Sequence, residues 1–66
     1  MTDDQIAEVV RQVARLETMG PDVGSLDALE TATGYGREQL KVLLAEAHSE
    51  GLVFFDATRD VWTIAD

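Results

Sequence analysis

The segment over residues 34–53, GYGREQLKVLLAEAHSEGLV, constrains the fold of this chain more than any other. It opens on a turn that contains two glycines and continues as an amphipathic stretch up to Gly51. Its apolar residues recur at the spacing that places side chains on one face of a helix: Leu40, Leu43, Leu44 and Ala47. The pattern predicts a helix over residues 37–50, capped by Gly51 and followed at once by an apolar strand.

A longer helix is predicted over residues 3–19. Its apolar side chains share one helical face: Ile6, Val9, Val10, Val13 and Leu16. Gly20 followed by Pro21 ends the pattern, because proline disfavours helical conformation at the residue before it and glycine serves as a C-cap.

A third, shorter helix is predicted over residues 26–33. Ser25 precedes it and has the hydroxyl that helix N-caps use. Gly34 can adopt the left-handed conformation of a C-cap, and Gly36 can stand as the N-cap of the helix that follows. Two helices joined by a short turn that contains glycine are typical of a helix-turn-helix.

The end of the chain has the pattern of a β-hairpin. Residues 52–55 and 61–64 are apolar enough for two strands, and residues 56–60 form a polar loop between them. Alternation along the strands predicts core positions for Leu52, Phe54, Trp62 and Ile64, with Trp62 largely buried against the helix over 37–50. The opposite face would then contain Val53, Phe55, Val61 and Thr63.

Length and composition indicate one domain over residues 1–66. The chain has no cysteine, no signal peptide and no apolar run near the roughly 18 residues of a membrane span, so we expect a cytoplasmic protein. Thirteen acidic and five basic residues give a net charge of −8, which repels a polyanion at long range. The same acidity also suits a surface adapted to solubility or to a salty cytoplasm.

Catalytic chemistry has little support in the sequence. His48, the only histidine, adjoins Ser49, and adjacent helical residues do not face each other. Asp56, Thr58 and Asp60 have the spacing of the start of a calcium loop, but the loop lacks its sixth-position glycine. We therefore expect no catalytic residues, metal, cofactor or small-molecule substrate.

The order of these elements resembles the winged helix-turn-helix family of small prokaryotic, archaeal and phage regulators. The segments that carry the resemblance are residues 25–29 (SLDAL), 33–40 (TGYGREQL), 43–44 (LL) and 50–53 (EGLV). The fold class that this implies is α+β, with three helices and a small antiparallel β-wing. The resemblance also implies a very short strand at residues 21–24 that pairs with the wing. Its implied function is DNA binding, with the helix over 37–50 in the major groove and the wing beside the backbone.

The basic residues fall where such a DNA reader needs them. Arg37 and Lys41 occupy the leading half of the third helix, Arg59 lies in the wing, and Gln39 can read a base edge. Three such bases give too few contacts for tight binding by one chain, so we expect a dimer. The candidate DNA-binding residues are Tyr35, Arg37, Glu38, Gln39, Lys41, Val42 and Arg59.

A second interpretation stays open, namely an adaptor that binds another protein and no nucleic acid. Tyr35, Val42, Ala45 and Phe55 would serve as apolar anchors at an interface. The surrounding acidic residues would then form a rim that attracts a basic partner.

Overall fold

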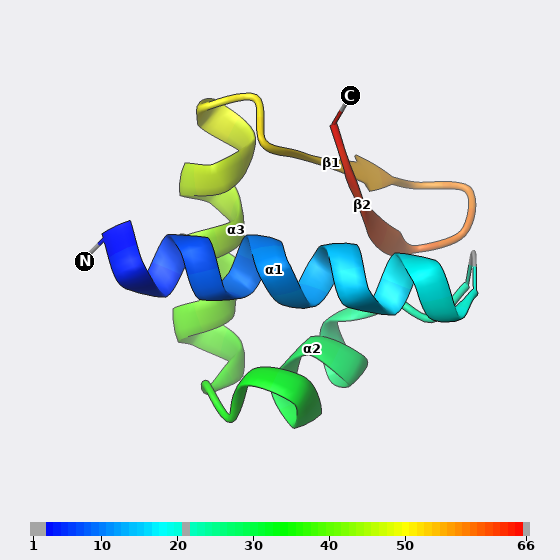
Figure 1. The fold of residues 1–66 in the computed structure, drawn as a ribbon, viewed down its shortest axis with the longest axis horizontal. Coiled ribbons are helices and arrows are strands. Elements are labelled where there is room, and N and C mark those ends of the chain that lie inside the picture. Colours follow the sequence, from blue (N-terminus) through cyan, green and yellow to red (C-terminus); the bar gives the residue numbers. More distant parts are fainter. Residues whose placement is uncertain (1–2, 21, 66) are drawn as a thin grey trace.

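The computed structural model describes residues 3–20 and 22–65, and within them it contains three helices and one hairpin. The expected α+β class is confirmed, and the layout is consistent with a winged helix-turn-helix. In Figure 1, α1 crosses in front of α3, α2 lies beside the second half of α1, and the hairpin lies on the other side of α1. The elements are α1 Asp3–Met19, α2 Leu26–Thr33, α3 Arg37–Ser49, β1 Val53–Asp56 and β2 Val61–Ile64.

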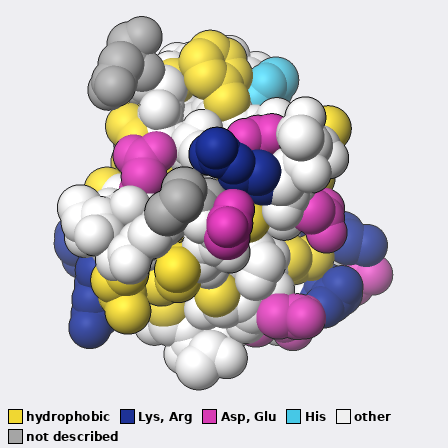
Figure 2. All heavy atoms as spheres, turned by 90° about the vertical axis from the view of Figure 1, so that its right-hand side faces the viewer, with side chains coloured by type: hydrophobic (Ala, Val, Ile, Leu, Met, Phe, Trp, Pro, Cys, Tyr) yellow, Lys and Arg dark blue, Asp and Glu magenta, His cyan; other side chains and the backbone are white. Residues whose placement is uncertain are grey.

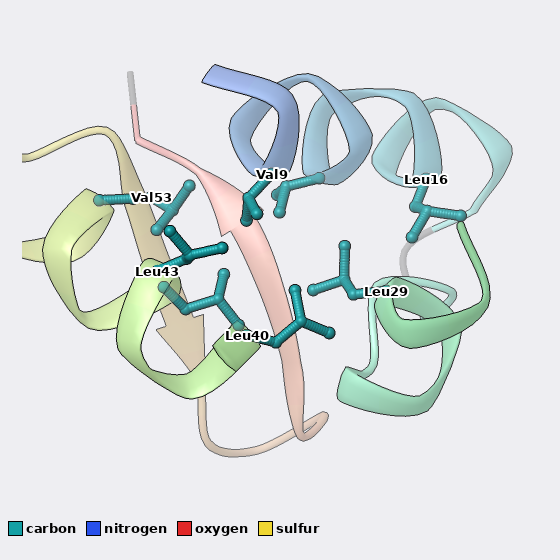
Figure 3. Packing of buried hydrophobic residues seen from close by; sticks show 9 residues of the cluster. Val9, Leu16, Leu29, Leu40, Leu43 and Val53 are labelled. Atoms are coloured by element: carbon teal, nitrogen blue, oxygen red, sulfur yellow. The ribbon is translucent and has the colours of Figure 1, made fainter. Parts of the chain in front are cut away.

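The core lies where the three helices and β1 meet. Figure 3 shows side chains from α1, α2, α3 and β1 converging on one another. Among the described residues, no polar or charged side chain is buried, so this core is held by apolar packing alone. The predicted apolar faces of the helices are confirmed by the buried cluster, which comprises Val9, Val13, Leu16, Leu29, Leu40, Leu43, Leu44, Ala47 and Val53.

The turn between α2 and α3 has the capping chemistry that the sequence predicts. The Ser25 hydroxyl accepts a hydrogen bond from the Ala28 amide at 3.2 Å and so caps α2. Gly34 has a φ of 78° and donates its amide to the Glu30 carbonyl at 2.9 Å. Gly36 then stands as the extended N-cap of α3. Because Gly34 alone turns the chain through the left-handed region here, α3 starts close to the end of α2.

The predicted face of β1 is wrong. Val53 is fully buried, whereas Leu52 and Phe54 are 40% and 52% exposed. The hairpin pairs Val53 with Ile64 and Phe55 with Trp62, so these four residues share one face. The four loop residues 57–60 leave odd-numbered residues of β1 opposite even-numbered residues of β2. The predicted grouping of Leu52 and Phe54 with Trp62 would require even-numbered residues of β1 opposite even-numbered residues of β2.

The prediction for β2 needs two corrections. Val61, expected on the outer face, is only 2% exposed. Its strand, β2, contacts α1 as well as β1 and so has neighbours on two sides. Trp62, expected to be largely buried, is half-buried at the edge of the core. Its ring is tilted against that of Phe55 with 5.1 Å between the centroids.

No third strand is present in the described part of residues 21–24. A single hydrogen bond takes its place, in which the Trp62 amide donates to the Gly24 carbonyl at 2.8 Å. Gly24 is buried, and a Cβ atom there would lie 2.7 Å from the carbonyl oxygen of Trp62. The close approach of two backbones therefore requires glycine at this position.

Gly24→Ala is expected to lower the free energy of unfolding by about 1–3 kcal/mol, because the added methyl group forces the α1–α2 connection away from β2. The matched control is Gly36→Ala, whose new Cβ meets no atom within 4 Å. Its expected cost stays below about 1 kcal/mol. Urea unfolding followed by circular dichroism measures both, and equal midpoints for the two variants would refute the close-approach explanation.

Candidate nucleic-acid interface

The leading half of α3, which is its N-terminal half, exposes its polar face to solvent. Leu40, Leu43 and Leu44 turn inward, so the helix is anchored along one side. The predicted DNA-binding residues on its other side are all exposed: Arg37, Glu38, Gln39, Lys41 and Val42. Arg59 is exposed on the hairpin loop, whereas Tyr35 is half-buried and packs against the core. Tyr35 therefore has a packing role as well as a place beside this face.

Arg37 is engaged by two acids of α2, which sequence reasoning did not foresee. Its guanidinium contacts the Asp27 carboxylate and lies 3.1 Å from the Glu30 carboxylate. The turn over residues 34–36 brings the outer side of α2 next to the first residue of α3. The Arg37 side chain is half exposed, so these pairs stabilise the fold by roughly 0–1 kcal/mol, but they compensate its charge locally.

The remaining bases differ in whether an acid compensates them. Arg59 lies 3.8 Å from the Asp22 carboxylate, and Arg11 lies 2.6 Å from that of Glu8. Lys41 and Arg15 form no ion pair within residues 3–20 and 22–65. On the hairpin side of the molecule, Figure 2 shows dark blue side chains interrupted by magenta, yellow and white ones. The described surface in that view therefore has no continuous patch of basic side chains.

A hollow of about 330 Å³ separates α3 from the hairpin. We call it the α3–hairpin groove. Phe55 and Trp62 form an aromatic wall, and the charged lining residues are two bases, Arg37 and Lys41, and one acid, Asp60. The groove shows that the leading half of α3 and the hairpin share one face of the molecule. Its lining residues are Leu26, Arg37, Lys41, Leu44, Ala45, Phe55, Asp60 and Trp62.

The hairpin loop is fixed by its own hydrogen bonds. The Asp56 carboxylate accepts from the amides of Thr58 and Arg59 at 3.0 and 3.3 Å, and the Asp60 amide donates to the Asp56 carbonyl at 2.7 Å. Asp60 closes the loop with a φ of 58°, a conformation that aspartate tolerates better than most residues. Arg59 is thus held on a defined turn, next to Asp60, which lines the α3–hairpin groove.

The described residues show no feature of a metal site or a membrane span. No group of three or more histidine, cysteine or acidic side chains there could hold a metal ion. His48 is exposed near the end of α3, and its ring meets the edge of Phe54 at 6.0 Å between centroids. None of the helices in the described ranges has the length and apolarity needed to cross a membrane.

Comparison of the chain with models of protein families, with curated proteins and with solved structures found no match. Function is therefore inferred from the geometry of α3, its turn and the hairpin.

Proposed function

We propose that this chain is a DNA-binding winged-helix protein, a small transcriptional regulator that reads DNA with α3. The observation that carries the proposal is the exposed leading face of α3, where Lys41 forms no ion pair with any described residue. Gln39, which is also exposed in this half of α3, can form paired hydrogen bonds with adenine, and Lys41 can bind guanine or a phosphate. The hairpin, on the same side, brings Arg59 toward the backbone of the duplex.

The net charge of −8 opposes the approach of DNA, but this repulsion is screened over about 8 Å at physiological ionic strength. At short range the local balance matters more, and residues 34–45 contain two bases and a single acid, Glu38. One chain then offers about three contacts, from Arg37, Lys41 and Arg59, which corresponds to a salt slope near −3. Two copies on adjacent half-sites double that slope, so the proposal includes a dimer.

The direct test is gel retardation of genomic fragments at about 50 mM salt, where phosphate contacts are strong. The folded protein is expected to retard a subset of fragments, and Arg37→Ala combined with Lys41→Ala is expected to abolish the shift. Folding of both proteins is checked by circular dichroism. A folded wild-type protein that retards no fragment would rule out the proposal.

Freeing Arg37 should strengthen DNA binding. Asp27→Asn combined with Glu30→Gln removes both of its acidic partners. Arg37 then no longer has to leave two carboxylates in order to reach a phosphate, so the affinity of a dimer should rise about tenfold while the salt slope stays near −3 per chain. The control is Glu46→Gln, an exposed acid at the other end of α3, for which we expect an increase of about twofold or less. Equal gains in both variants would show that Arg37 does not contact DNA.

The α3–hairpin groove favours a second candidate function, an adaptor that binds a protein. Of the predicted apolar anchors, Ala45 and Phe55 line the groove and Val42 is 49% exposed. Tyr35 is half-buried and contributes less surface. An apolar side chain of a partner would match the aromatic wall of this groove, and basic residues elsewhere on the partner would match the acidic surface of the chain.

A further inference from the structure

A second apolar surface lies away from the hairpin loop, on the first half of α1 and the connection from α3 to β1. In Figure 1 the first turns of α1 and the hairpin loop are at opposite sides of the molecule. Here a hollow of about 490 Å³ is lined by four apolar side chains and three charged ones. We call this surface the α1 face, and its residues are Asp3, Ile6, Ala7, Val10, Arg11, Glu50 and Leu52.

Two of the three charged residues of the α1 face, those on α1 itself, are arranged symmetrically around a small residue. Asp3, Ala7 and Arg11 follow one another at four-residue intervals and so lie on one side of α1. Asp3 and Arg11 are about 6 Å from Ala7 in opposite directions along the helix axis. A two-fold axis through Ala7 would therefore bring Asp3 of one copy opposite Arg11 of another, and the reverse.

Arg11 is able to take part in such a pair. It already contacts Glu8 of its own helix at 2.6 Å, yet its side chain is 67% exposed. A guanidinium group has five N–H donors, so a second carboxylate can bind it without displacing the first. Ala7 is exposed and small, which lets two helices approach closely at the centre of the contact.

Apolar residues next to this line supply area for an interface. Ile6 and Val10 are half-buried, and Leu52 is 40% exposed. Phe54, two residues further along the chain, is 52% exposed. A standard interface takes about 800 Å² from each partner, which is about a fifth of the 4070 Å² surface of the described structure. A domain of this length buries little apolar surface alone, so covering these residues adds stability.

We propose that the α1 face binds a second copy of this chain, with the two α1 helices antiparallel and two reciprocal Asp3–Arg11 ion pairs. This interface would supply the dimer that the proposed function includes. Only the use of the dimer in DNA binding rests on the proposed function. None of the residues in the leading half of α3 lines the α1 face, so each copy keeps its DNA-reading side exposed.

Sedimentation equilibrium of the full chain without DNA, from micromolar to millimolar concentration, tests the proposal. The average mass is expected to rise from 7.2 kDa toward twice that value, and Ala7→Glu is expected to stay monomeric. Arg11→Glu should weaken association at least tenfold. Combining it with Asp3→Arg should restore association, because the reciprocal pairs form again with their signs exchanged and the net charge is unchanged.

The control is Arg15→Glu, which makes the same charge change on α1 but lies outside the α1 face. It should leave association unchanged, and circular dichroism should show every variant folded. A wild-type chain that remains monomeric at millimolar concentration would overturn the proposal, as would a double exchange that fails to restore the dimer. A dimer that binds no DNA would support the α1 face as the interface and rule out DNA binding. A monomer that retards DNA would support DNA binding and rule out the α1 face as the interface.

Discussion

Leu44→Ala is expected to lower the free energy of unfolding by about 2–5 kcal/mol and to leave much of the chain unfolded at room temperature. Leu44 is 1% exposed and belongs to the core between the helices and β1. Domains have about 0.05–0.15 kcal/mol of stability per residue, roughly 3–10 kcal/mol for 66 residues, so a loss of this size removes a large part of the stability. Thermal unfolding followed by circular dichroism measures the change.

The control for this substitution lies two residues earlier on the same helix. Val42 is 49% exposed and lies outside the buried cluster, so Val42→Ala should change the free energy of unfolding by less than about 0.5 kcal/mol. The difference between the two variants reports burial rather than helix propensity. Melting of the Leu44 variant within a degree of the parent would contradict the core that Figure 3 shows.

Lys41→Ala is expected to weaken DNA binding about a hundredfold in a dimer. A hydrogen bond to a charged group contributes roughly 1.5–3 kcal/mol, about tenfold or more in affinity, and each of the two copies loses one. Lys41 is the base on α3 that forms no ion pair with a described residue, so its charge is fully available to DNA. Fluorescence anisotropy with a labelled fragment selected by gel retardation measures the affinity.

Arg15 is a matched control for Lys41. Both side chains are exposed, both lie on helices, and neither forms an ion pair within the described ranges. Arg15 contributes to a hollow between α1 and α2, away from the α3–hairpin groove. Arg15→Ala should therefore weaken binding by less than about threefold. Similar losses in both variants would mean that net charge, rather than α3, governs the affinity.

The helices could be predicted because their signals are local. Ranges 3–19 and 26–33 were predicted as the structure has them, since helical spacing, Ser25 and the glycines each act within a few residues. The third helix ends at Ser49, one residue before the predicted end, because Glu50 already forms its cap before the left-handed Gly51.

The hairpin could be located but not oriented from the sequence. The number of loop residues between the paired ends decides whether Val53 or Phe54 shares a face with Trp62 and Ile64. Alternation along each strand does not show whether that number is odd or even. Both residues are apolar, so composition did not decide between them. For the same reason, the sequence did not predict that Phe55 and Trp62 share a face and form the aromatic wall of the α3–hairpin groove.

The exposed residues of α3 followed from its helical period, but their electrostatic state did not. Arg37 meets Asp27 and Glu30 only because the turn folds α2 back beside the start of α3. Asp27 is ten residues from Arg37 in the chain, so no spacing rule within one helix connects them. The pair of acids on one side of α2 was the available signal, together with the glycine turn that follows.

The most direct measurement for the proposed function is a heteronuclear NMR titration of the labelled protein with an operator-length duplex found by gel retardation. DNA binding through α3 predicts amide shifts centred on Arg37, Gln39 and Lys41 that weaken steeply as salt rises. Unchanged α3 amides with DNA, together with shifts at Val42, Ala45 and Phe55 when a basic protein partner is added, would contradict DNA binding and favour the adaptor.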